Sequence, residues 1–195
     1  MGITKITVSS LRVADIIVST TDAKISGVIR NAIGSDVSHA ALFTKANFVI
    51  EAIGEGVKEH QIQDAYKEAT LAIVLRRKHM TDIQRNNVVT NARKFAGLAY
   101  DATGAAGSGM MNKRGLLLGA TGCMLSPVGC AIGEAEILSN ASDKNKDKKF
   151  FCSELVARAF ELAGVPIADG PATYTNPRAI RTSSRLIYVG HLIGG

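Results

Sequence analysis

One cysteine stands where a helix is expected to begin. In KKFFCSELVARAF (148–160), Cys152 separates a lysine-rich stretch from an apolar run whose residues recur at helical spacing. Unpaired N–H groups and the dipole at the first turn of a helix stabilise a thiolate, and also the oxyanion that forms when sulfur attacks a carbonyl. Cys152 is therefore a candidate nucleophile for acyl transfer. A small core residue at a helix start explains this stretch alone at least as well.

A thiol nucleophile needs a base, and the chain contains four histidines. His60 lies in a polar stretch and His79 just before a helix start, so both are expected to be solvated surface residues. His191 lies in the last predicted strand, where it is either a core histidine or a base. His39 opens the predicted strand SHAALFT (38–44) directly after a turn, and it is the preferred candidate.

The next predicted strand offers a carboxylate to orient that base. If 38–44 and 47–53 form a hairpin around Lys45, His39 lies opposite Glu51, and directly opposed residues point to the same face of a sheet. Glu51 stands inside the apolar run FVIEAI, where burial without a partner is costly. An imidazole–carboxylate pair explains both placements. The alternative is a solvent-facing Glu51 on a half-exposed strand.

The elements that must position these residues follow from periodicity and turn signals. Three helices are expected: one ended by Gly34, one over 80–97 with a capping box of Thr81 and Gln84, and one over 151–164. In the last, Glu154, Arg158 and Glu161 are expected to face outward. Strands are predicted at 14–19, 38–44, 47–53, 70–77 and 185–193. Strands, then helices, then a strand favour an α+β fold with an antiparallel sheet.

Several segments, taken together, resemble the permuted NlpC/P60 proteins of the YiiX/YebB type. They are ADIIVST, SDVSHAALF, VIEA, AGLAYD, FFCSELVARAFELAGV and YTNPRAIRTSSRL, and they cover most of the chain except 102–149. The resemblance implies a circularly permuted papain-like fold in which the strand with histidine precedes the helix with cysteine. It implies Cys152 as nucleophile, His39 as base and Glu51 as orienting residue. Tyr100, Asp101, Ser38 and Ser153 are the residues expected at the substrate site.

Length and composition set limits on the remaining possibilities. The 195 residues fit one domain, 1–195, with a Gly/Ala-rich insertion at about 102–149. A net charge of +6 suits an anionic partner, whereas 5% aromatic residues and no tryptophan argue against nucleic acid. Cys123 and Cys130 are either a disulfide or two reduced thiols, and no metal or other cofactor is expected. The uncharged span 115–133 favours a buried or lid-like helical hairpin over a membrane-inserting segment.

The resemblance implies a thiol hydrolase, and a peptidoglycan amidase or endopeptidase is the first expectation, because the positive net charge suits an anionic wall. The N-terminus lacks a signal-peptide pattern, so we expect synthesis in the cytoplasm and, for a wall-acting enzyme, export by a signal-independent route, as for an antibacterial effector. Such an effector implies an immunity or secretion carrier protein as partner, and the chain itself is expected to be a monomer. Two alternatives stay open: a lipid hydrolase or acyltransferase of the lecithin:retinol-acyltransferase-like type, and a binding module with an inert thiol.

Overall fold

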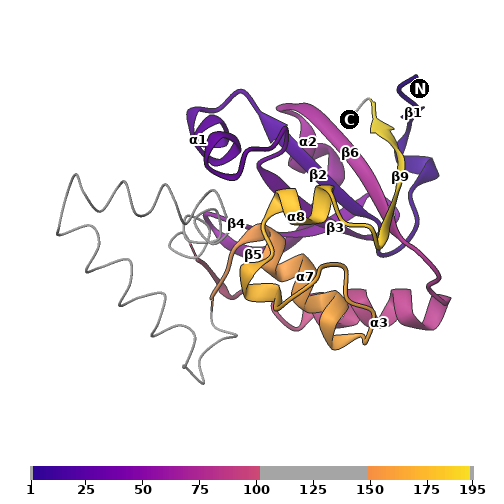
Figure 1. Cartoon of the computed structure of the whole chain (residues 1–195). Coiled ribbons are helices and arrows are strands. Elements are labelled where there is room, and N and C mark those ends of the chain that lie inside the picture. The colour runs from indigo at the N-terminus through magenta and orange to yellow at the C-terminus, as the bar shows by residue number, and fades with distance from the viewer. Residues whose placement is uncertain (1, 102–148, 194–195) are drawn as a thin grey trace.

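The computed structural model describes residues 2–101 and 149–193, and these form a mixed α+β fold around one large sheet (Figure 1). Its seven strands run in the order β1-β9-β6-β2-β3-β4-β5, and β7 and β8 form a separate parallel pair. The strands are β1 (Lys5–Ile6), β2 (Ile16–Thr21), β3 (His39–Lys45), β4 (Phe48–Ile53), β5 (Gly56–Gln61), β6 (Ala69–Arg77), β7 (Ala99–Tyr100), β8 (Lys149–Phe150) and β9 (Leu186–Leu192). The helices are α1 (Lys24–Ile33), α2 (Ile62–Tyr66), α3 (Asp82–Arg93), α7 (Cys152–Leu162) and α8 (Pro177–Arg181), with 3-10 turns η1 (Val8–Ser10) and η2 (Ala172–Tyr174).

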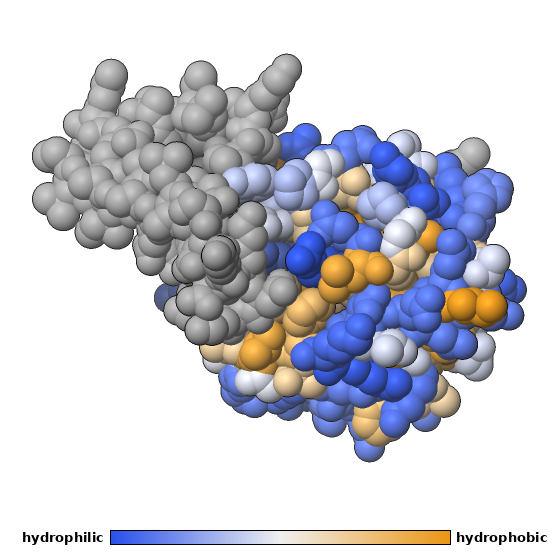
Figure 2. Space-filling model, turned by 90° about the horizontal axis from the view of Figure 1, so that it is seen from below, coloured by the Kyte–Doolittle hydropathy of each residue, from blue (hydrophilic) through white to orange (hydrophobic). Residues whose placement is uncertain are grey.

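Side chains alternate between the two faces of the sheet, and each face has its own core. On one face, Ile16, Leu42 and Ile50 pack with apolar residues of α3 and α7. On the other, Phe43 and Val49 pack with α2. In Figure 1, α3 and α7 accordingly lie together below the sheet. The outer face of this helical layer is largely hydrophilic, with small separate hydrophobic areas (Figure 2).

The start of α3 and the end of α1 are set by capping residues that can be recognised in the sequence. The Thr81 hydroxyl accepts from the Gln84 N–H at 3.2 Å and the Gln84 side chain accepts from the Thr81 N–H at 2.9 Å, which is the predicted capping box of α3. Helix α1 ends at Gly34, whose φ of 62° is left-handed and favours glycine.

The α+β class and the five predicted strands are confirmed, and the bounds of these strands differ from the predicted bounds by at most two residues.

Two elements of the structure were not predicted from the sequence, and some predictions concern residues that the structure does not describe. Strand β5 and helix α2 were not expected, because GVKEHQ is a polar stretch without alternating hydrophobic residues. Such composition is typical of a strand at the edge of a sheet, which is where β5 lies. The predictions for 115–133, for Cys123 and Cys130, and for nearly all of the insertion fall outside the described residues. None of the described helices is long and apolar enough to cross a membrane.

Candidate active site

Cys152 is the first residue of α7, and the strand pair β7–β8 leads the chain into it. The Asp101 N–H donates to the Phe150 carbonyl at 2.9 Å, which ties β7 to the end of β8. Phe150 is buried with its ring centroid 4.5 Å from that of Phe95. Cys152 itself is only 6% exposed. The β7–β8 pair and the buried Phe150 ring therefore hold the chain in place where α7 begins.

The surroundings of the Cys152 sulfur favour a thiolate. Burial opposes the charged form, but the imidazole of His39, which hydrogen-bonds the sulfur, and the N–H groups of Ala40 and Ser153 lower the pKa of the Cys152 thiol. The Ser153 N–H belongs to the first turn of α7, as expected for a helix start. The Ala40 N–H comes from β3, so strand and helix both supply donors to this sulfur.

His39 connects the sulfur to Glu51. The His39 Nε2 lies 2.5 Å from Glu51 Oε2, and Nδ1 is the ring nitrogen left for Cys152. Burial disfavours the imidazolium, yet the negative charges of Cys152 and Glu51 raise the pKa of His39 well above its usual value. The residues that the sequence proposed as nucleophile, base and orienting group therefore meet in one hydrogen-bonded series.

The predicted register of the hairpin is wrong by two residues, although its consequence holds. Leu42 pairs with Ile50, so the continued register places Ala41, and not His39, opposite Glu51. The pairing shifts at Thr44 and the chain turns at 46–47, where Asn47 has a φ of 64°, rather than around Lys45. A shift of two keeps side chains on the same face, so His39 still reaches Glu51 diagonally.

His60 also belongs to this cluster, and the prediction that it is a solvated surface residue is wrong. Its Nε2 lies 2.5 Å from Glu51 Oε1, and its side chain is 21% exposed. It comes from β5, where it pairs with Val49 and thus shares a face with Glu51. The Glu51 side chain is only 4% exposed. Burial raises its pKa, but His39 and His60 outweigh this and lower the pKa of Glu51 to about 2.

The four predicted substrate-site residues lie around this cluster in different ways. Tyr100 is half-buried, and burial, the Cys152 charge and Asp101 raise its pKa to about 12. Asp101 continues β7 beside Phe150. Ser38 is buried and its hydroxyl lies 3.0 Å from that of Thr20. Ser153 is fully buried, and its Oγ has no hydrogen-bond partner within the described part of the chain.

Two buried groups near the site were not found from the sequence. Glu154 was expected outward but is 6% exposed, and burial raises its pKa to about 8 although its carboxyl group accepts from the Phe151 N–H. Tyr66 on α2 is buried, and its hydroxyl lacks a hydrogen-bond partner among residues 2–101 and 149–193. Burial and the charges of Glu51 and Cys152 raise the pKa of Tyr66 well above its usual value. The helical periodicity of 151–164 predicts an exposed Glu154, and an isolated tyrosine such as Tyr66 gives no indication of burial beside the site.

The other two histidines lie away from the cluster. His79 is exposed, as expected. His191 is half-exposed on β9, and its Nδ1 lies 2.6 Å from the Tyr188 hydroxyl. Two strands, β6 and β2, separate β9 from β3 in the sheet, which places the backbone of β9 about 14 Å from that of β3. His191 is therefore not in position to serve Cys152.

Comparisons with known proteins fit this geometry. No protein-family model matches the chain. The chain is 28% identical over 211 aligned positions to "Probable lipoprotein peptidase YaeF" of Escherichia coli strain K12, an alignment that covers all of this chain and 75% of that protein. The crystal structure of the metalloprotein YiiX from Escherichia coli O157:H7 superposes with a TM-score of 0.65 at 16% identity, over 93% of this chain and 97% of that one. Within the part of the present chain that is described, no three His, Cys, Asp or Glu side chains are grouped to hold a metal ion.

These findings show similarity to YaeF in sequence and to YiiX in structure. Because the superposition covers nearly the whole of both chains, the predicted papain-like arrangement of sheet and helices is confirmed. The sequence similarity, which spans the whole chain, is to a protein named as a peptidase. The chain thus has the YiiX fold and is similar in sequence to YaeF.

Proposed function

We propose that this protein is a cysteine hydrolase of the permuted NlpC/P60 type, with Cys152 as nucleophile, His39 as base and Glu51 as the residue that orients His39. The observation that carries the proposal is the hydrogen-bonded series from the Cys152 sulfur through His39 to the buried Glu51 carboxylate. The similarity to YaeF, named a probable peptidase, supports the same reaction class.

The reaction in this proposal is acyl transfer through a thioester. His39 takes the proton of Cys152, and the thiolate forms a bond to the carbonyl carbon of an amide. Backbone N–H groups at the start of α7 stabilise the oxyanion. As the C–N bond breaks, His39 returns its proton to the leaving amine. Water, deprotonated by His39, then attacks the thioester, releases the carboxylic acid and restores the thiol.

Glu51 has two tasks in this scheme. Its Oε2 holds the Nε2–H of His39, which directs Nδ1 to the sulfur, and its negative charge stabilises the imidazolium that forms with each proton transfer. The carboxylate itself stays ionised, since its pKa of about 2 is far below that of the imidazole.

We propose peptide amides of peptidoglycan as the substrate class. The similarity to a probable peptidase favours an amide over an ester, and the formal charge of +6 favours association with an anionic wall polymer. Tyr100, whose ionisation is influenced by Cys152, and Asp101 next to it are the residues proposed to contact the peptide first.

The test is digestion of purified sacculi by the wild-type protein and by Cys152→Ala. We expect new amine-bearing muropeptides from the wild type alone, resolved by chromatography and mass spectrometry. Phospholipid vesicles are the second substrate in the same experiment. Fatty acid released from vesicles, with sacculi untouched, would transfer the substrate class to lipids, and the absence of both products would contradict the proposed hydrolase activity.

A further inference from the structure

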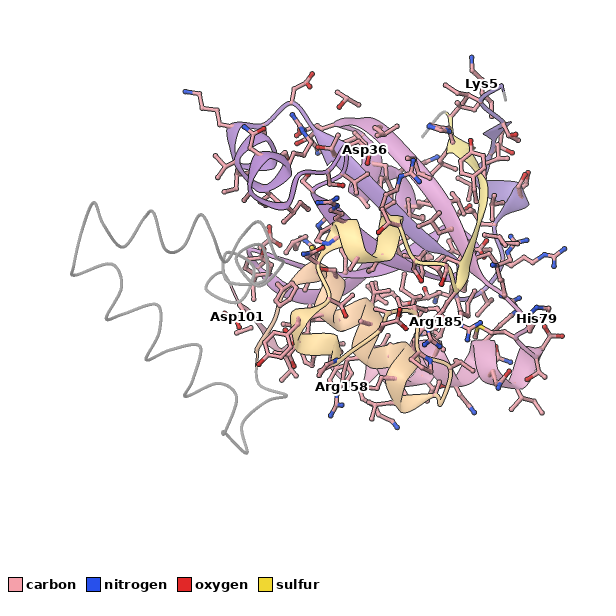
Figure 3. The ribbon with its side chains drawn as sticks, viewed as in Figure 1. Lys5, Asp36, His79, Asp101, Arg158 and Arg185 are labelled. Carbon is pink, nitrogen blue, oxygen red and sulfur yellow. The ribbon has the colours of Figure 1, made fainter. Side chains whose placement is uncertain are left out.

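A pocket of about 710 Å³ lies between the end of α1 and helix α8, and its walls carry three arginines. Arg30 comes from α1, and Arg178 and Arg181 from α8, so residues about 150 positions apart in the chain meet here. Asp36, on the loop between α1 and β3, is the one carboxylate among the lining residues. Figure 3 labels Asp36 in the region of α1 and α8.

The positive charges of this arginine pocket exceed what its neighbours neutralise. Arg181 lies 3.6 Å from Asp36, measured from Nε to Oδ2, and within the described residues this buried Nε has no hydrogen-bond partner. Asp36 can balance one guanidinium group. Arg30 and Arg178 are therefore left without a carboxylate among the residues that line the pocket.

Within the described residues, Arg30 and Arg178 donate hydrogen bonds to neutral acceptors. Arg30 donates to the Thr20 hydroxyl and, at 2.9 Å, to the Thr21 carbonyl. Arg178 donates to the Ile33 carbonyl at 3.1 Å, at the C-terminal end of α1. This helix end carries about half a negative charge, which accounts for one structural use of Arg178. This partial charge offsets only a part of the two positive charges of Arg30 and Arg178. The neutral acceptors hold both guanidinium groups in fixed positions.

The loop that lines the arginine pocket leads into the strand that carries His39. Asp36 precedes His39 by three residues, so their Cα atoms are at most about 11 Å apart. The Thr20 hydroxyl that accepts from Arg30 is also 3.0 Å from the hydroxyl of Ser38, the residue before His39. A peptide bound with its scissile carbonyl at Cys152 can therefore reach the pocket with a side chain or residue a short distance along its length.

We propose that the arginine pocket is a substrate subsite that binds a carboxylate of the peptide. Guanidinium groups match carboxylates in shape and charge through paired N–H donors, which explains why arginine, and not lysine, is suited to a fixed site of this kind. The inference rests on the proposed function and adds a specificity to it: acidic peptides are selected over their neutral counterparts.

The experiment measures binding separately from turnover. Calorimetric titrations use Cys152→Ala protein, which keeps the pocket, and a peptidoglycan stem peptide with free carboxylates alongside the same peptide with every carboxylate amidated. We expect the free acid to bind about tenfold or more tightly than the amide. Adding Arg178→Gln and Arg181→Gln should remove that preference. Arg185→Gln is the matched control, because Arg185 pairs with Asp169 at the surface, well below Asp36 in Figure 3, and should keep it.

Equal affinity for acid and amide, or a preference that survives in the double variant, would overturn the subsite. Because Arg178 also contacts the end of α1, thermal unfolding is measured in parallel, and Arg181→Gln alone replaces the double variant if the latter is unfolded. Among the described residues Arg181 Nε has no hydrogen-bond partner, so this single change removes one positive charge and the ion pair with Asp36 but leaves the contact of Arg178 with the end of α1 intact. A preference for the acid in binding, with no turnover by the wild type on any peptide, would reject the hydrolase proposal and keep the subsite.

Discussion

The imidazoles of His39 and His60 bind the two oxygens of one buried carboxylate, Glu51, each at 2.5 Å. The three residues come from neighbouring strands, β3, β4 and β5, so the sheet itself sets their spacing. A carboxylate held at both oxygens cannot rotate freely. His39 is therefore oriented toward Cys152 by a group that is itself held in place.

The first prediction concerns the pH at which Cys152 becomes reactive. Its pKa is lowered by His39 and two backbone N–H groups, so the thiolate persists as the pH falls below the usual thiol pKa of about 8.5. We expect iodoacetamide to alkylate Cys152 rapidly at pH 6 to 7, with peptide mapping to separate it from Cys123 and Cys130. His39→Ala should move the midpoint to higher pH. A wild-type profile identical to that of free cysteine would contradict the activated thiolate.

The second prediction concerns the charge of Glu51. Glu51→Gln preserves the shape of the side chain but removes the charge that helps to raise the pKa of His39. The imidazolium then becomes less stable, so the pKa of His39 should fall and kcat should drop by about 100-fold or more, with KM nearly unchanged. NMR titration of His39 and steady-state kinetics measure the two effects. An unchanged pKa of His39 would show that Glu51 does not hold its charge.

Parts of this site follow from the sequence because each leaves a local signature. Cys152 starts an apolar helical run, and Glu51 interrupts an apolar strand, where an ionised group needs a partner. Their meeting with His39 survived an error in the register, because a shift of two residues returns each side chain to the same face. These signals indicate candidates only, and the assignment of Cys152 and His39 as nucleophile and base also rests on the resemblance of their segments to permuted NlpC/P60 proteins.

The remaining parts depend on long-range placement that no local pattern reports. His60 lies on an edge strand whose polar sequence resembles a loop. Its contact with Glu51 can be recognised only once β5 is known to pair with β4. The Ala40 N–H that faces the sulfur is a backbone group and leaves no trace in the sequence. Glu154 falls on the outer side of a helical wheel, yet the chain around α7 covers it. The arginine pocket joins helices from opposite ends of the chain.

The third prediction separates the hydrogen bond of His60 from the bulk of its ring. His60→Ala removes the donor to Glu51 Oε1, so we expect a tenfold or larger loss of kcat with little change in KM, about 1.4 kcal/mol or more in transition-state stabilisation. His60→Gln places an amide N–H in a similar position and should recover most of the rate. His191→Gln, on a remote strand, is the matched control and should behave as wild type. Equal losses in the Ala and Gln variants would refute a positioning role through Glu51.

The fourth prediction uses Glu154 to connect burial with stability. Burial raises the pKa of this carboxyl group to about 8, whereas in the unfolded chain it is about 4.3. Between these values the folded protein holds a proton that the unfolded chain has released. Raising the pH through this window therefore lowers the free energy of unfolding, by about 1.4 kcal/mol per unit at most, and the stabilisation is fully present only below the unfolded pKa.

Glu154→Gln carries no titrating group but keeps an oxygen for the Phe151 N–H. We expect it to match the wild type near pH 4 and to be more stable by a few kcal/mol at pH 9. Urea unfolding across this range measures the difference. Glu161→Gln is the control, because Glu161 lies on the same helix, is 39% exposed and pairs with Arg158. If the stability difference between Glu154→Gln and wild type is the same at both pH values, Glu154 does not hold its proton in the folded protein, and burial at the start of α7 costs less than its position implies.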